Sequence, residues 1–162
     1  MRVVVADTSP IRYLLQINHI DLLPKLFGNI LIPSAVADEL RHLSAPVNVQ
    51  SWIQQPPDWL RIMQGEELDD PQLEKLDPGE RAAIALGLSK GAHLILIDDR
   101  AGVAAASNKG IETTGTLGIL DLAAGRRLIR LSDALEMLKR TNFRYRQTIL
   151  DQLLKQYESG AW

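Results

Sequence analysis

The sequence predicts an α/β fold in which a parallel sheet is covered by helices on both faces. Three short apolar runs, at residues 3–6, 30–32 and 94–97, have the continuous apolar character of strands buried on both faces. Helical segments separate these runs, and strands that alternate with helices join through right-handed crossovers into parallel sheets. The chain has 162 residues, 46% of them hydrophobic, which is enough to bury a sizeable core. We therefore expect a single domain over residues 1–162.

The other elements are expected in order along the chain. Ser9 is placed to cap the first helix, and a later helix has Val36, Leu40 and Leu43 on its apolar side. Asp77 opens a strong helix, with a glutamate three residues later at the spacing of a capping box. Helices are expected at residues 10–17, 20–27, 34–43, 47–55, 81–90, 100–108, 117–125, 132–140 and 145–157, an edge strand at 59–63, a further strand at 111–113 and an acidic surface loop at 65–75.

Composition excludes several classes of protein. The chain has no cysteine, which excludes disulfide scaffolds, cysteine-ligated zinc and thiol catalysis. Its three histidines share no metal-ligand spacing, and the apolar run at residues 3–6 is too short for the core of a signal peptide. No apolar run approaches the roughly 18 residues of a membrane span. We therefore expect a soluble, cytoplasmic protein.

Acidic side chains follow two of the predicted strands at the point where each strand ends. Asp7 comes directly after the first strand, and Asp98 and Asp99 come after the third buried run. Because the carboxyl ends of parallel strands meet at one edge of a sheet, we expect these side chains to share that edge. Glu39 and Glu80 lie early enough on their helices to point toward it. Carboxylates without histidine or cysteine suit a hard cation, Mg²⁺ or Mn²⁺, which can activate water.

Each carboxylate also has a purely structural interpretation. Asp98 or Asp99 can cap the helix that follows, and Glu39 can be a boundary residue on a solvated helix. Glu80 is balanced between two roles, because Asp77 and Glu80 have the spacing of a capping box. The spacing alone leaves both roles for Glu80 open.

Five motifs in order give the sequence a resemblance to the PIN-domain ribonucleases. Within that superfamily they resemble most the predicted nucleic-acid-binding proteins related to VapC toxins. The motifs are VADTSP at residues 5–10, IPxxVxxEL at 32–40, LDxGExxAIxL at 76–86, LIDDR at 96–100 and TGTLG at 114–118. The resemblance covers about residues 3–125 and continues into the helical tail.

This resemblance implies a three-layer α/β/α PIN-like fold with a central, mostly parallel sheet of about four to five strands. The core would cover about residues 1–125 and a helical C-terminal extension about 126–162. It also implies Mg²⁺- or Mn²⁺-dependent hydrolysis of RNA phosphodiester bonds, with single-stranded RNA as the substrate. The matching acidic positions are Asp7, Glu39, Glu80 and Asp98, with Asp99 as an auxiliary ligand and Thr8, Ser9 and Thr116 as polar neighbours that hold metal-bound water or a phosphate.

The resemblance further implies the toxin of a type II toxin–antitoxin pair, a homodimer and a small antitoxin protein. The alternative is a catalytically silent module of the same fold that binds RNA or an antitoxin. Two other phosphate-transferring classes fit poorly. Haloacid-dehalogenase-like phosphatases need a second aspartate where this chain has Ser9, and response-regulator receivers need paired acids after the first strand and a late-strand lysine.

The net charge of −2 conceals two regions of opposite charge. Residues 1–125 hold 10 basic and 16 acidic residues, whereas residues 126–162 hold 8 basic and 4 acidic ones. A basic tail can contact RNA or an acidic antitoxin segment, and it can equally be a solvated helix face. The leucines of the tail recur at helical spacing, which suits packing on the sheet or a partner surface. The candidate contact residues are Arg126, Arg127, Arg130, Arg140 and Arg144.

Overall fold

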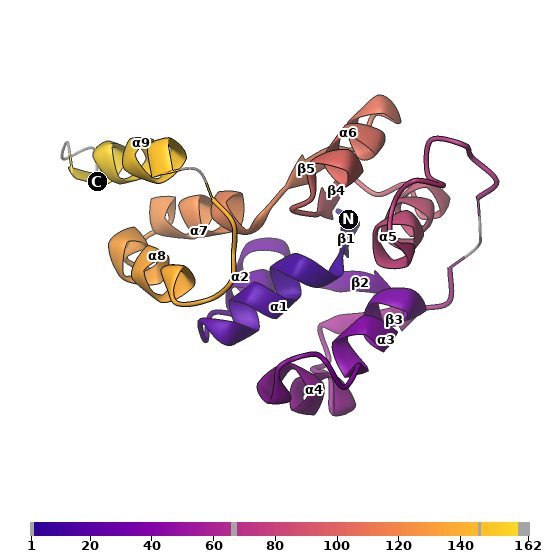
Figure 1. Ribbon diagram of the computed structural model, residues 1–162, viewed down its shortest axis with the longest axis horizontal. Helices are drawn as coiled ribbons and strands as arrows, with labels where there is room; N and C mark the ends of the chain where they lie inside the picture. Colours follow the sequence, from indigo (N-terminus) through magenta and orange to yellow (C-terminus); the bar gives the residue numbers. More distant parts are fainter. Residues whose placement is uncertain (1, 66–67, 146, 159–162) are drawn as a thin grey trace.

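A computed structural model describes residues 2–65, 68–145 and 147–158, and within them the strands form one parallel sheet. The strand order is β3-β2-β1-β4-β5, with every neighbouring pair parallel (Figure 1). Val5 of the central strand pairs with Leu31 on one side and with Ile95 on the other. The strands are β1 (Val4–Ala6), β2 (Ile30–Pro33), β3 (Leu60–Met63), β4 (Leu94–Leu96) and β5 (Glu112–Thr114).

Helices cover both faces of the sheet, as the sequence predicts. Val4 and Ala6 of β1 point into one hydrophobic cluster, whereas Val5 points into the other, because successive strand residues face opposite sides. The helices are α1 (Thr8–Gln16), α2 (Leu22–Phe27), α3 (Ser34–Arg41), α4 (Val47–Gln54), α5 (Pro78–Ser89), α6 (Arg100–Asn108), α7 (Thr116–Gly125), α8 (Leu131–Lys139) and α9 (Gln147–Glu158). The larger cluster receives side chains from α1 to α4 and from α7 to α9, and the smaller receives them from α5 and α6. The three-layer α/β/α fold is therefore confirmed.

Two local predictions are wrong. Helix α1 begins at Thr8 with Asp7 in the N-cap position, so Ser9 lies inside the helix and does not cap it. Helix α3 ends at Arg41, which leaves Leu43 90% exposed instead of on an apolar helix face. The segment predicted as a surface loop has no helix or strand in its described part and is mostly exposed, as expected, and Leu73 anchors it by packing into the smaller cluster beside α5 and α6. Residues 66 and 67 of that segment lie outside the described part of the chain.

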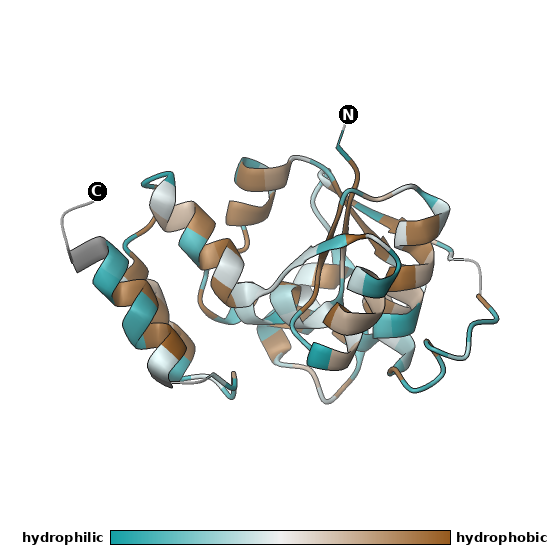
Figure 2. Ribbon diagram, turned by 90° about the horizontal axis from the view of Figure 1, so that it is seen from above, coloured by the Kyte–Doolittle hydropathy of each residue, from teal (hydrophilic) through white to brown (hydrophobic). Residues whose placement is uncertain are grey.

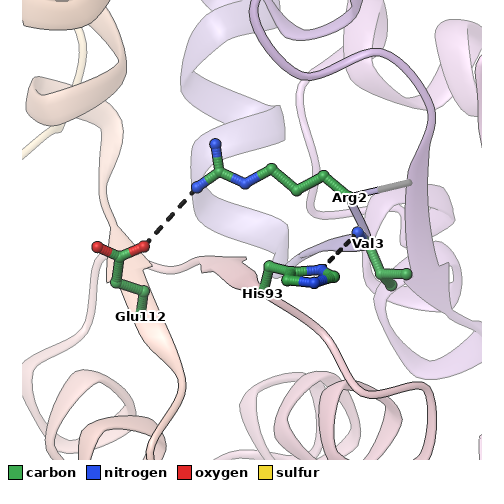
Figure 3. Close-up of polar contacts among 4 residues, drawn as sticks. All are labelled: Arg2, Val3, His93 and Glu112. Atoms are coloured by element: carbon green, nitrogen blue, oxygen red, sulfur yellow. Dashed lines mark hydrogen bonds and ion pairs between the residues drawn. The ribbon is translucent and has the colours of Figure 1, made fainter.

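The amino-terminal end of β1 is tied to the start of β4 and to the edge strand β5. The backbone N–H of Val3 donates a hydrogen bond of 2.9 Å to Nδ1 of His93, and the Arg2 guanidinium lies 3.7 Å from the Glu112 carboxylate (Figure 3). The side chains of Arg2 and Glu112 are largely exposed, so their ion pair contributes little to stability. His93 thus has a structural partner at the edge of the sheet opposite to the strand-end aspartates.

Helices α8 and α9 form the carboxyl-terminal part of the described chain and pack beside α7. Leu131, Leu135 and Leu138 of α8 and Leu150 of α9 are buried in the larger cluster. In Figure 2 the helix next to the C-terminus carries apolar and polar residues on different sides, as expected for a helix packed on one face. None of the helices within residues 2–65, 68–145 and 147–158 has the length and apolar character needed to cross a bilayer.

Candidate functional site

Asp7 lies at the carboxyl end of β1, where the chain leaves the sheet and enters α1. Its backbone N–H donates to the carbonyl oxygen of Leu96 at 2.8 Å, which fixes Asp7 against the end of β4. Its side chain is 4% exposed, makes no capping hydrogen bond, and its Oδ1 has no hydrogen-bond partner within the described chain. Burial raises the pKa of the Asp7 carboxyl to about 8, and the negative charges of Asp77, Glu80 and Glu39 add to this effect.

Glu80 lies in the first turn of α5, and the side chain that caps this helix is that of Asp77, not that of Glu80. The Asp77 carboxylate accepts a 2.8 Å hydrogen bond from the Glu80 backbone N–H, so Asp77 is the N-cap. The Glu80 side chain is buried, and burial together with the charges of Asp77 and Asp99 raises its pKa to about 7. The Glu80 carboxyl therefore lies near the carboxylates of Asp77 and Asp99.

Asp98 follows β4 and is held by the start of α7. Its Oδ1 accepts a hydrogen bond of 2.6 Å from the Thr116 backbone N–H, and its Oδ2 accepts one of 2.7 Å from the Thr116 hydroxyl. Burial raises the pKa of Asp98, while these two hydrogen bonds act in the opposite direction. Gly115 permits the close approach, since a Cβ at that position would lie 2.6 Å from Asp98 Oδ1. Thr116 is fully buried and acts on Asp98 directly.

Glu39 connects three helices near the same edge of the sheet. One carboxylate oxygen accepts a hydrogen bond of 3.1 Å from the Gly79 backbone N–H at the start of α5, and the other accepts one from the Thr8 hydroxyl at the start of α1. A Cβ at Gly79 would lie 2.6 Å from Glu39 Oε1, so glycine leaves the space that this contact needs. Thr8 thus has a role as a partner of Glu39.

Asp99 occupies the N-cap position of α6. Its Oδ2 accepts hydrogen bonds from the backbone N–H groups of Ala101 and Gly102, at 3.0 and 3.3 Å. Of the two consecutive aspartates, Asp99 therefore takes the structural role and Asp98 is turned toward Thr116. Asp99 remains exposed at the site and adds negative charge beside Glu80.

The acids line two cavities that are separated by the start of α1. Glu80, Asp98, Asp99 and Ser9 line a cleft of about 840 Å³. Thr8 and Glu39 line a second cavity of about 480 Å³. The consecutive residues Thr8 and Ser9 line different cavities, and the buried Asp7 that precedes them lines neither of the two. The predicted acids thus lie near one edge of the sheet, but Glu39 lines one cavity, Glu80, Asp98 and Asp99 line the other, and Asp7 is buried.

The donor set at this edge fits a divalent cation in its chemistry. All of its charged groups are carboxylates, and Asp7 Oδ1 is a buried oxygen without a partner. Within residues 2–65, 68–145 and 147–158, however, no three or more His, Cys, Asp or Glu side chains converge to hold a metal ion. The reason is that several carboxylates are directed toward protein donors: Glu39 toward Thr8 and Gly79, and Asp98 toward Thr116.

The predicted basic residues of the tail lie in different places. Arg144 lines the 840 Å³ cleft together with the acids, whereas Arg140 lines a separate cavity of about 410 Å³ beside Gln16 and Asn48. Arg126, Arg127 and Arg130 follow the carboxyl end of α7, and Thr116 begins that helix at the acidic edge. A helix of this length separates its ends by about 15 Å. The structure therefore brings one of the five predicted arginines to the cleft that holds the acids.

Sequence reasoning missed several residues of this cleft. Arg100, Tyr13, Asn142, Phe143 and Tyr145 all line it. Arg100 follows Asp99 at the end of a buried strand, so its place beside the acids was visible in the sequence. Tyr13 lies on α1 four residues after Ser9, and this spacing places both on one face of the helix. Asn142, Phe143 and Tyr145 reach the cleft through tertiary packing of the tail on α1, for which no sequence signal exists.

The fold is an α/β/α sandwich around a parallel sheet, with the carboxylates of Asp7 and Asp98 directly after its neighbouring strands β1 and β4. These features place the protein among α/β proteins with an acidic site at the carboxyl ends of the strands. Residues 3–159 match the model of the DUF3368 family, which is described as a PIN domain. The chain therefore belongs to the PIN-domain family, and with it has a nuclease-type fold. A comparison with curated proteins found no match. The narrower resemblance to the toxin-related branch stays a prediction.

Proposed function

We propose that the protein is a metal-dependent ribonuclease that hydrolyses RNA phosphodiester bonds at the acidic edge of the sheet. The observation that carries this proposal is the buried Asp7 carboxyl at the end of β1, whose Oδ1 has no partner in the described chain, with Asp98 after the neighbouring strand β4 and Glu80 in the first turn of α5. Clustered, desolvated carboxylates destabilise a fold because their charges repel and lack solvent. A bound cation offsets this repulsion, so such a cluster favours a functional site. PIN domains are in general nucleases, which supports the same reading.

Asp7, Glu80 and Asp98 would hold the cation, with Glu39 and Asp99 contributing charge around it. A bound Mg²⁺ or Mn²⁺ supplies an activated water and offsets negative charge on the phosphate. Thr116 fixes the orientation of the Asp98 carboxylate through two hydrogen bonds. Gly79 and Thr8 fix Glu39 in the same way. The cleft lined by Glu80, Asp98 and Ser9 leaves space for the phosphodiester beside these groups.

The direct test compares the wild type with Asp7→Asn on a labelled single-stranded RNA. We expect Mn²⁺- or Mg²⁺-dependent cleavage by the wild type, no cleavage in EDTA, and loss of cleavage in Asp7→Asn with an unchanged circular dichroism spectrum. Arg61→Ala is a matched surface control, because Arg61 is exposed on the edge strand β3, away from the acids. Full activity of Asp7→Asn would overturn the assignment of the site.

The toxin role, the small antitoxin, the homodimer and the cytoplasmic location belong to the same proposal and are supported by the resemblance of the five motifs. Growth inhibition on expression of the wild type, and none on expression of Asp7→Asn, tests the toxin role. We also propose one domain over residues 1–162, with a core of about 1–125 and an extension of about 126–162. The burial of Leu131, Leu135 and Leu150 in the larger cluster supports this organisation.

One observation favours a second candidate, a catalytically silent module that binds RNA or an antitoxin. The carboxylates of Glu39, Asp98 and Asp99 all accept hydrogen bonds from the protein instead of converging on a shared point. Calorimetric titration with Mn²⁺ separates the two candidates. The ribonuclease requires Mn²⁺ binding that Asp7→Asn weakens, whereas the silent module binds RNA with no dependence on the cation.

A further inference from the structure

The connection between α8 and α9 is fixed to α1 at a defined place. The Tyr13 hydroxyl donates a hydrogen bond of 2.9 Å to Asn142 Oδ1, and the rings of Tyr13 and Phe143 pack edge to face with centroids 5.0 Å apart. Within the connection, the Phe143 backbone N–H donates to the Thr141 hydroxyl oxygen at 3.1 Å. In Figure 1 this connection passes beside α1, in agreement with these contacts. Residues 142–145 therefore form a wall of the acidic cleft, which we call the tail wall.

Two arginines line the cleft together with the acids. Arg100 begins α6 directly after Asp99, and Arg144 lies on the tail wall. Both side chains are exposed, and neither forms an ion pair with any residue in the described part of the chain. Asp98 raises and Arg144 lowers the pKa of the Tyr13 hydroxyl, so both charges lie near Tyr13. A cleft that is lined both by acids and by arginines without an ion-pair partner in the described chain suits a chain of phosphates that passes over a cation site.

The tail wall also presents an aromatic ring to the cleft. Tyr145 lines the cleft and is 36% exposed, and Ile149 of α9 lies beside the same space at 40% exposure. Tyr13 and Phe143 pack against each other, whereas no ring contact within the described residues engages Tyr145. An exposed aromatic ring beside arginines is the usual arrangement for stacking an unpaired base.

We propose that the tail wall is the nucleotide-recognition surface of the acidic cleft, with Arg100 and Arg144 on the phosphates that flank the scissile one and Tyr145 stacked on an unpaired base. This inference rests on the proposed function, because it takes the acids as the point of cleavage. It selects a single-stranded substrate, since a base within a duplex is stacked on its neighbours and its face is not available to Tyr145. It also separates Arg144 from Arg126, Arg127 and Arg130, which lie at the far end of α7.

Binding of a single-stranded RNA that carries a fluorescent label tests the inference by anisotropy. The measurements use the Asp7→Asn chain, so that the strand stays intact, and add Arg144→Ala, Arg100→Ala, Tyr145→Ala or Tyr145→Phe to it. We expect Tyr145→Ala to weaken binding by about 5- to 150-fold, the range of one base–aromatic stacking contact. Tyr145→Phe keeps the ring and should bind as the parent does. Arg144→Ala should reduce the salt dependence of binding by about 0.7 in the logarithmic slope, as for one lost phosphate contact.

A base analogue gives a signature that a structural role would not produce. 2-Aminopurine placed in the RNA loses fluorescence when it stacks, so the parent and Tyr145→Phe should quench it and Tyr145→Ala should not. Arg61→Ala removes the same charge from β3 and should leave both binding and quenching unchanged. Binding and quenching by Tyr145→Ala and Arg144→Ala that equal those of the parent would overturn the inference, and so would equal affinity for duplex RNA.

The two proposals fail in different ways. If the wild type cleaves RNA but the tail-wall variants bind and cleave as it does, the proposed ribonuclease activity is supported and the proposed role of the tail wall is wrong. If the wild type does not cleave RNA, and its binding of RNA depends on Tyr145 and Arg144, the proposed role of the tail wall in binding is supported and the proposed ribonuclease activity is wrong.

Discussion

Thr116 holds Asp98 through both of its donors, the backbone N–H at 2.6 Å and the hydroxyl at 2.7 Å. The two bonds reach different carboxylate oxygens, so they fix the plane of the carboxylate as well as its position. Thr116 is fully buried, so its hydroxyl is not accessible to a ligand in the cleft. Its effect on chemistry therefore passes through Asp98.

This relationship predicts the behaviour of substitutions at Thr116. Thr116→Val keeps the shape of the side chain and the backbone donor but removes the hydroxyl, and we expect Mn²⁺ affinity to fall by about 10- to 100-fold, as for other partners of metal ligands. Thr116→Ser restores the hydroxyl and should recover most of the affinity. Calorimetric titration measures both variants. Equal affinity in Thr116→Val and the wild type would show that the backbone N–H alone positions Asp98.

The buried carboxyls predict how stability depends on pH when divalent cations are removed. The pKa of Asp7 is raised from 3.8 to about 8 and that of Glu80 from 4.5 to about 7, so the folded chain binds these protons more tightly than the unfolded chain does. The stabilisation from such groups is complete below about pH 4 and is lost as the pH rises to about 8. His19, whose pKa is lowered by burial, acts in the opposite direction below its ordinary value of 6.5. We expect urea denaturation in EDTA to give a larger free energy of unfolding at pH 5.5 than at pH 8.5.

Asp7→Asn is the control for this pH dependence. The neutral amide removes the buried charge, so the variant should be more stable than the wild type at pH 8.5 and its pH slope should be shallower, with a difference on the order of a few kcal/mol. Addition of Mn²⁺ should stabilise the wild type at pH 8.5 and leave Asp7→Asn almost unchanged. A wild-type pH profile that Asp7→Asn reproduces would assign the effect to another group.

Asp77 and Glu80 should separate stability from chemistry. Asp77→Ala removes the side chain that caps α5 and should lower the free energy of unfolding by about 0.5–2 kcal/mol. Glu80→Gln leaves the cap in place, so we expect unchanged or increased stability and loss of RNA cleavage. Denaturation curves and cleavage rates of the two variants are compared directly. A destabilised Glu80→Gln that still cleaves would make Glu80 part of the cap.

Gly115 should tolerate no side chain. In Gly115→Ala the new Cβ would meet Asp98 Oδ1 at 2.6 Å and the Ile97 carbonyl oxygen at 3.3 Å. The backbone of Ile97 cannot yield easily, so we expect Asp98 to be displaced from Thr116, a loss of stability of about 1–3 kcal/mol and weaker Mn²⁺ binding. Gly65→Ala is the matched control, because a Cβ there meets nothing within 4 Å. Equal stability of the two variants would show that Asp98 can move without penalty.

The sequence was sufficient to predict the strands, the parallel sheet with helices on both faces, and the position of acids after β1 and β4. Each of these depends on local patterns: continuous apolar runs for β1, β2 and β4, and the aspartates that follow them. It was not sufficient to predict the partners of the acids, because Glu39 is held by Thr8 and Gly79 through tertiary contacts. The tail wall was beyond reach for the same reason, since the Tyr13–Asn142 hydrogen bond joins residues 129 positions apart. Leu43 was misplaced because apolar spacing continued past the point where α3 ends.

Helix α1 holds Asp7 and the contact point of the tail wall at a constant separation. Asp7 lies at its N-cap, and Tyr13, which anchors the tail wall, lies further along the same helix. At 1.5 Å per residue these positions are roughly 9 Å apart along the axis. Cleavage and base recognition would then occur at a spacing set by helical geometry rather than by loop conformation. Under these proposals, an RNA strand would be cut at a fixed number of nucleotides from the base that Tyr145 selects.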